Sequence, residues 1–101
     1  MLCSDGQGGV FLAFQDNVIP PRILIDRFSG LGNKVFAGNA VSPALLDQTA
    51  VGLVSDGGTG AIVTWEDHRN GVFDQVFAQR ILSDGAIAPG WPATGLVGAR
   101  T

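Results

Sequence analysis

The sequence predicts an all-β protein made of two copies of one four-stranded antiparallel unit, each of about fifty residues. Three features predict this fold. A turn sequence occurs twice, short β-branched and aromatic runs lie between clusters of Gly, Asp and Pro, and no segment has a convincing helical pattern. The best helical candidate, residues 44–49, is too short to matter. Repeat 1 spans about residues 1–48 and repeat 2 about residues 49–101.

The repeat is clearest in its first turn and the strand that follows. Ser4–Gly9 reads SDGQGG and Ser55–Gly60 reads SDGGTG, which sets an offset of 51 residues. At this offset the run VFLAFQD aligns with AIVTWED, and two notable pairs correspond: Phe14 with Trp65, and Asp16 with Asp67. The register then slips by two residues, as a change of loop length would cause, and further pairs follow: Asp26–Arg27 with Gln79–Arg80, and Gly32 with Gly85.

The second copy shows the four strands of the unit most clearly. A short apolar strand over 49–54 is followed by a Gly-rich turn and by the β-branched and aromatic run 61–65. The next turn ends in Asn70–Gly71, a pair that favours a tight hairpin, and leads into the partly alternating run 73–82. Two prolines then mark the last strand, at 96–97, as an edge strand.

Four short strands punctuated by turns, with a proline-rich outer strand, are typical of a β-propeller blade. The first copy starts with Met1–Cys3, only a stub of the strand that 49–54 supplies in the second copy. We therefore expect one blade to lack a strand or to borrow one.

One run carries a resemblance to a known family. The segment WEDHRNGVFDQVFAQRILSDG, from Trp65 to Gly85, and the following Gly90–Trp91–Pro92 resemble a repeat of bacterial multi-repeat β-propeller proteins. That repeat has a Gly-Gly turn, an apolar strand ending in Trp, a turn with Asp and Arg, and an Ala-Gln-Arg strand before a Gly-Asp type turn. Repeat 1 departs from it at Phe14, at 17–21 and at 25–27. The resemblance implies a propeller fold for nearly the whole chain and says little about activity.

Composition excludes several classes of protein. The chain is 46% hydrophobic and 15% charged, which is incompatible with disorder. Its net charge of −3 argues against nucleic acid and anionic membrane as partners. No apolar run approaches the roughly 20 residues of a membrane helix, and no signal peptide is visible. Localisation stays open, although the repeat that the chain resembles is typical of secreted or cell-surface bacterial proteins.

The polar and aromatic residues each have a structural and a functional interpretation. Asp67, His68, Arg69 and Trp91 are the candidate ligand-binding residues, with the three polar residues at a blade rim and Trp91 as a stacking surface for a sugar. A turn held by the Asp67 carboxylate, with Arg69 paired to it, explains the cluster better. We expect Trp65 to pack between blades and His68 to be an exposed turn residue without a nucleophile beside it.

No cofactor or metal site is expected. The chain holds three Asp-Gly turns, at Asp5, Asp56 and Asp84, and each offers one carboxylate where Ca²⁺ needs several oxygen ligands. The lone Cys3 cannot form an internal disulfide and is expected to be an inert thiol. No glycine turn opens a helix, so a phosphate loop is absent from the sequence pattern.

The sequence therefore predicts a binding or scaffold module without catalytic activity, with a carbohydrate or a protein as its ligand. The alternative is a part of a larger extracellular enzyme, such as a glycosidase, whose catalytic residues lie elsewhere. Two blades leave two apolar faces, so we expect self-association into a ring, most simply a homotrimer of about six blades, with a dimer or a tetramer as alternatives.

Overall fold

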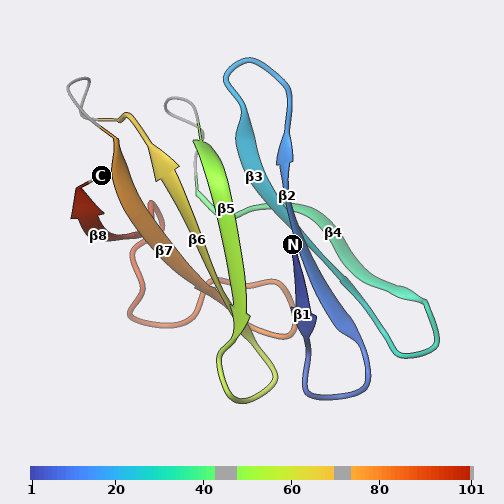
Figure 1. Cartoon of the computed structure of the whole chain (residues 1–101). Coiled ribbons are helices and arrows are strands. Elements are labelled where there is room, and N and C mark those ends of the chain that lie inside the picture. The colour runs from blue at the N-terminus through green and yellow to red at the C-terminus, as the bar shows by residue number, and fades with distance from the viewer. Residues whose placement is uncertain (43–47, 70–73, 101) are drawn as a thin grey trace.

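The structure is a computed structural model that describes residues 1–42, 48–69 and 74–100. Within these residues the chain is all-β and contains no helix, which confirms the predicted fold class (Figure 1). The strands are β1 (Leu2–Ser4), β2 (Val10–Asp16), β3 (Arg22–Phe28), β4 (Lys34–Ala40), β5 (Gln48–Ser55), β6 (Ala61–Asp67), β7 (Gln75–Ile81) and β8 (Leu96–Arg100). The expected Asn70–Gly71 hairpin turn and most of the short helical candidate lie outside the described residues.

The strands form two four-stranded antiparallel sheets whose orders follow the chain, β1-β2-β3-β4 and β5-β6-β7-β8. A single bridge between Ile81 and Ile87 adds a short fifth segment to the second sheet. The expectation that one unit would lack a strand is wrong. Only three residues long, β1 still pairs in full register with β2, from Leu2 opposite Leu12 to Ser4 opposite Val10.

The two sheets share their strand order and the hydrogen bonding of their first turns. In the first turn, the Asp5 carboxylate accepts hydrogen bonds from the N–H groups of Gln7 and Gly9. Asp56 does the same with Gly58 and Gly60. Each turn therefore closes on its own Asp side chain, as Asx turns do.

The later turns correspond as well, with the offset of 53 residues that the sequence predicts. Gly32 donates to the Ser29 carbonyl, and Gly85 donates to the Leu82 carbonyl. Both glycines have a positive φ, 82° and 90°, which a side chain would strain. Similar hydrogen bonds thus close the first turn of each sheet and the turn after its third strand.

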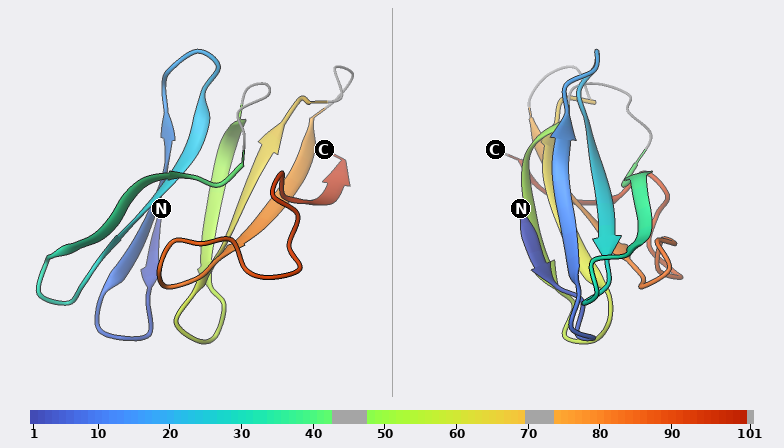
Figure 2. Two further views of the ribbon diagram at one scale, coloured as in Figure 1. Left: turned by 180° about the vertical axis from the view of Figure 1, so that it is seen from behind. Right: turned by 90° about the vertical axis from the view of Figure 1, so that its right-hand side faces the viewer.

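The sheets meet where β5 lies against β1, β2 and β3, as the left-hand view of Figure 2 shows for β5 beside the first sheet. One apolar core fills this contact. Its fully buried members come from both sheets: Phe11, Ala13, Ile23, Ile25, Ala61, Val63 and Trp65. Each sheet contains about half of this short chain and would have only marginal stability without the shared core, so the two sheets stabilise each other.

The contact joins unlike faces of the two units. In sheet 1 the face that carries Phe11 and Arg27 turns toward sheet 2 and is buried. The corresponding face of sheet 2 carries Ile62 and Arg80 and points away from sheet 1, because Val63, on the opposite side of the same strand, belongs to the shared core. The units therefore stack head to tail.

Two polar side chains fix this stacking. The Gln48 Oε1 accepts a hydrogen bond from the Ile23 N–H at 2.9 Å, so the start of β5 is bound to the middle of the first sheet. Arg27 donates from Nη1 to the Ser83 carbonyl, in the turn after β7, at 2.6 Å. Both side chains are buried, and both satisfy backbone groups that the contact removes from water.

Candidate functional site

Asp67 is the centre of the polar cluster that the sequence singles out. It is the last residue of β6, and its buried carboxylate accepts a hydrogen bond from Trp65 Nε1 at 3.0 Å. Arg69 donates to the same carboxylate from its backbone N–H and its guanidinium, at distances from 2.6 to 3.2 Å. Burial disfavours the charged form of Asp67, but the bonds from Arg69 and Trp65 outweigh it and lower its pKa.

Arg69 connects the turn to the outer edge of the sheet. Its guanidinium carbon lies 3.5 Å from the centre of the Phe77 ring, a cation–π contact. Its Nη1 donates to the Thr94 carbonyl at 2.8 Å. The Phe77 ring in turn stacks on Trp65, with ring centres 6.1 Å apart. The structure therefore places Asp67 and Arg69 in a clamp that closes one end of the second sheet.

His68 points elsewhere. Its Nδ1 lies 3.0 Å from the Asp74 carboxylate, and both side chains are about half exposed. No serine, cysteine or threonine is bonded to it among the contacts described. The geometry matches an exposed side-chain contact between His68, just after β6, and Asp74, just before β7, and we expect such a contact to have little effect on stability.

Trp91 belongs to a loop, residues 88–95, that has no counterpart of the same length in repeat 1. Two turns shape the loop: Trp91 donates its N–H to the Ala88 carbonyl, and Gly95 donates to the Pro92 carbonyl. The buried Gln79 of β7 anchors the loop, because the Gln79 Nε2 donates a hydrogen bond to the Pro92 carbonyl at 2.7 Å. The Trp91 side chain is only partly buried on this anchored loop.

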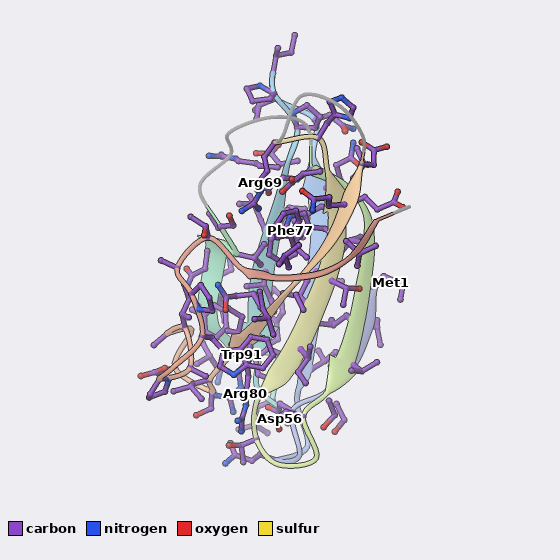
Figure 3. All side chains as sticks on the ribbon, turned by 90° about the vertical axis from the view of Figure 1, so that its left-hand side faces the viewer. Met1, Asp56, Arg69, Phe77, Arg80 and Trp91 are labelled. Carbon is purple, nitrogen blue, oxygen red and sulfur yellow. The ribbon has the colours of Figure 1, made fainter. Side chains whose placement is uncertain are left out.

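The four candidate residues do not form one site. Figure 3 shows Arg69 beside Phe77 near one end of the second sheet, whereas Trp91 lies farther down, toward Arg80 and Asp56. Asp67 and Arg69 belong to the structural clamp, His68 to an exposed contact with Asp74, and Trp91 to the loop. Of these, Trp91 has the position that suits a ligand, because an anchored, partly exposed aromatic ring offers a flat surface at low entropic cost.

In two of the Asp-Gly turns the aspartate carboxylate accepts a hydrogen bond from an arginine. Arg27 Nε donates to Asp5 at 3.1 Å, and Arg80 Nε donates to Asp56 at 3.1 Å. Burial opposes ionisation of Asp5, but the N–H groups of Gln7 and Gly9 and the Arg27 guanidinium lower its pKa. Within the described residues no three His, Cys, Asp or Glu side chains gather as a metal site would require. Burial raises the pKa of the Cys3 thiol, and the negative charges of Asp5 and Asp56 raise it further, which makes the thiol a poorer nucleophile.

Sequence reasoning missed the roles of three buried polar residues: Arg27 and Gln48, which join the sheets, and Gln79, which holds the Trp91 loop. Arg27 was matched to Arg80 as a repeat position, but its bond to Ser83 was not foreseen. Gln48 was not singled out, and Gln79 was named only as a repeat position, although both are buried. The available signal for Gln79 was its match with Asp26, because both are polar residues that directly precede the matched arginines Arg27 and Arg80.

Comparisons with protein-family models, with curated proteins and with solved structures found no match for this chain. None of the described residues forms a helix long and apolar enough to cross a membrane.

Proposed function

We propose that the chain is a pair of β-propeller blades that acts as a binding or scaffold module and not as a catalyst. The observation that carries this proposal is the head-to-tail stacking of two equivalent four-stranded sheets, with β5 against the face of the first sheet. Blades of a propeller are four-stranded sheets that repeat radially in this way. The resemblance of residues 65–92 to a bacterial propeller repeat agrees with it.

The charged residues support a role without catalysis. Asp5, Asp56 and Asp67 each bind an arginine and backbone N–H groups, so their carboxylates are committed to turns. A glycosidase would need two carboxyl groups facing each other across a sugar, about 5–9.5 Å apart. Nothing in the described part of the chain favours that alternative.

The Trp91 loop is the binding surface we propose. Gln79 holds the loop at Pro92, and Arg69 holds it at Thr94, so the ring is presented on a fixed backbone. Carbohydrate is the ligand class that we expect, because sugars stack their apolar faces on exposed aromatic rings. A glycan array with the wild-type protein and Trp91→Ala tests this: the expected result is binding that the substitution abolishes, with His68→Ala as the control that keeps it.

The absence of catalysis has its own test. Esterase, glycosidase and phosphatase substrates should show no turnover above the uncatalysed rate, because no nucleophile–base pair is built in the described residues. Turnover that disappears in His68→Ala or Asp67→Asn would contradict the proposal and make the turn after β6 an active site.

A further inference from the structure

The two ends of the molecule carry the two halves of the contact that joins its sheets. We define the outer face of sheet 1 by Leu2, Leu12 and Phe14, and the outer face of sheet 2 by Val54, Ile62 and Arg80. We propose that a second copy of this chain covers each outer face, with sheet 2 of one copy stacked on sheet 1 of the next. This inference rests on the proposed function, because it treats each sheet as a blade.

The first strands of the two units show the complementarity. Leu53 pairs with Val63 on the side that faces sheet 1, and only 7% of its surface is exposed. Its counterpart at the offset of 51 residues is Leu2, which pairs with Leu12 on the outer face and is 68% exposed. Equivalent leucines are thus buried between the two sheets, as Leu53 is, and exposed on the outer face of sheet 1, as Leu2 is.

The opposite side of these strands repeats the pattern. Cys3 pairs with Phe11 and packs against the shared core. Its counterpart Val54 pairs with Ile62 on the outer face of sheet 2 and is 57% exposed. Each chain therefore carries a bare copy of both sides of its own internal contact.

The arginines give the contact its polar part. Arg27 and Arg80 hold their turn aspartates through Nε at the same distance, 3.1 Å. Arg27 also donates to the Ser83 carbonyl of the neighbouring sheet, and its side chain is 11% exposed, against 43% for Arg80. The position equivalent to Ser83 in repeat 1 is Gly30. Arg80 would therefore donate to the carbonyl of the partner's Gly30.

The turns that meet inside the chain are also free at its ends. A Cβ placed on Gly85 would lie 3.1 Å from the Phe36 ring and 2.5 Å from Asn39, whereas nothing lies within 4 Å of that position on Gly32. Leu31, beside Gly32, is 90% exposed at the tip of the turn. In a second copy stacked by the internal geometry, the next chain would cover Gly32 as Phe36 and Asn39 cover Gly85 now, whereas Leu31, like its counterpart Asp84, would stay exposed at the tip of the turn.

The same comparison holds for the first turns. A Cβ placed on Gly6 would lie 2.5 Å from the Gly58 carbonyl, whereas the equivalent position on Gly57 has nothing within 4 Å. Gly57 would thus abut the partner's Gln7, which corresponds to Gly58. The turns, the arginines and the first strands all indicate that the outer faces bind a surface like the one buried between the two sheets. A second copy of the chain carries such a surface.

A contact between unlike faces must close into a ring or continue as a filament. Propellers have about four to eight blades, so chains with two blades close as dimers, trimers or tetramers. We place the closed form at three chains, as the sequence predicts from the bulk of the Trp and Phe side chains between blades.

Two single substitutions and their mixture test the head-to-tail contact. Leu2→Asp damages only the outer face of sheet 1, and Val54→Asp only the outer face of sheet 2. The wild type is expected to sediment at about three times the chain mass, and each variant alone as a monomer with an unchanged far-UV circular dichroism spectrum. An equal mixture should form a dimer of one copy of each, because each retains the face that the other needs.

Other outcomes overturn the proposal. A monomeric wild type means that the outer faces do not bind each other. If one variant stays assembled while the other dissociates, the contact joins two like faces. If the mixture stays monomeric at concentrations where the wild type is assembled, the faces are not complementary. Leu53→Asp distinguishes failure of the contact between chains from failure of the proposed blade arrangement. Leu53 lies in the contact between the two sheets of one chain, so this substitution should unfold the chain even if the wild type is a monomer.

Discussion

Replacing Trp65 with Ala should lower the free energy of unfolding by about 3–5 kcal/mol, the range for truncating a large buried aromatic side chain. Trp65 is fully buried in the core between the sheets and stacks on Phe77. Its Nε1 also satisfies the buried Asp67 carboxylate, so the substitution removes a hydrogen bond along with the ring. Chemical denaturation measured by circular dichroism gives the value.

Trp91→Ala is the matched control for this substitution. It removes the same type of side chain, but from the loop between β7 and β8, where the ring is only partly buried. Its cost should therefore be clearly smaller. A near-neutral Trp65→Ala, or a Trp91→Ala that costs more, would contradict the placement of Trp65 between the sheets.

Arg27→Met should produce the second large loss of stability. The substitution removes a guanidinium that is shared by the Asp5 carboxylate and the Ser83 carbonyl, and it leaves the buried Asp5 carboxylate with fewer partners. Arg22→Met, on the same strand, is the control, because Arg22 pairs with Asp16 where both side chains are substantially exposed. The unfolding midpoint of Arg27→Met should lie well below that of Arg22→Met. Equal midpoints would show that Arg27 does not join the sheets.

This loss should depend on pH. The pKa of Asp5 is lowered in the folded chain, so its ionised form contributes stability above the ordinary aspartate pKa of about 3.9, and that contribution is lost as the pH falls through the lower folded value. Without Arg27 this pKa rises. The difference in stability between wild type and Arg27→Met should therefore be largest near neutral pH and shrink below about pH 4. A difference that is constant from pH 3 to 7, measured by thermal unfolding, would contradict the role of the Asp5 charge.

Local patterns predicted the elements of this fold well because turns and strands are encoded by neighbouring residues. The SDG turns, the AIVTW strand and the edge strand at Leu96–Val97 are all in the structure. The sequence matched Asp5 with Asp56 and Arg27 with Arg80 as repeat positions, but it did not predict the two ion pairs that these residues form in the structure.

Contacts between distant segments could not be predicted in the same way. Gln48 binds Ile23 across the sheets, and its polarity in the sequence gives no sign of its partner. The Trp91 loop required the structure too, because Gln79 and Arg69 reach it from separate parts of the second sheet. The turn cluster was interpreted correctly as an Asp67–Arg69 pair, since an Asx turn is local, but its link to Phe77 and Trp65 is not.

The stacking of the two sheets is tested most directly by nuclear Overhauser effects in the intact protein. A Cβ on Gly85 would lie 3.1 Å from the Phe36 ring, so the α proton of Gly85 that occupies this position faces the ring. We expect cross-peaks between the Gly85 α protons and the Phe36 ring protons, and a ring-current shift of the Gly85 signals that Phe36→Leu removes. Gly85 α protons at unshifted positions, without cross-peaks to Phe36, would contradict the head-to-tail contact between the sheets.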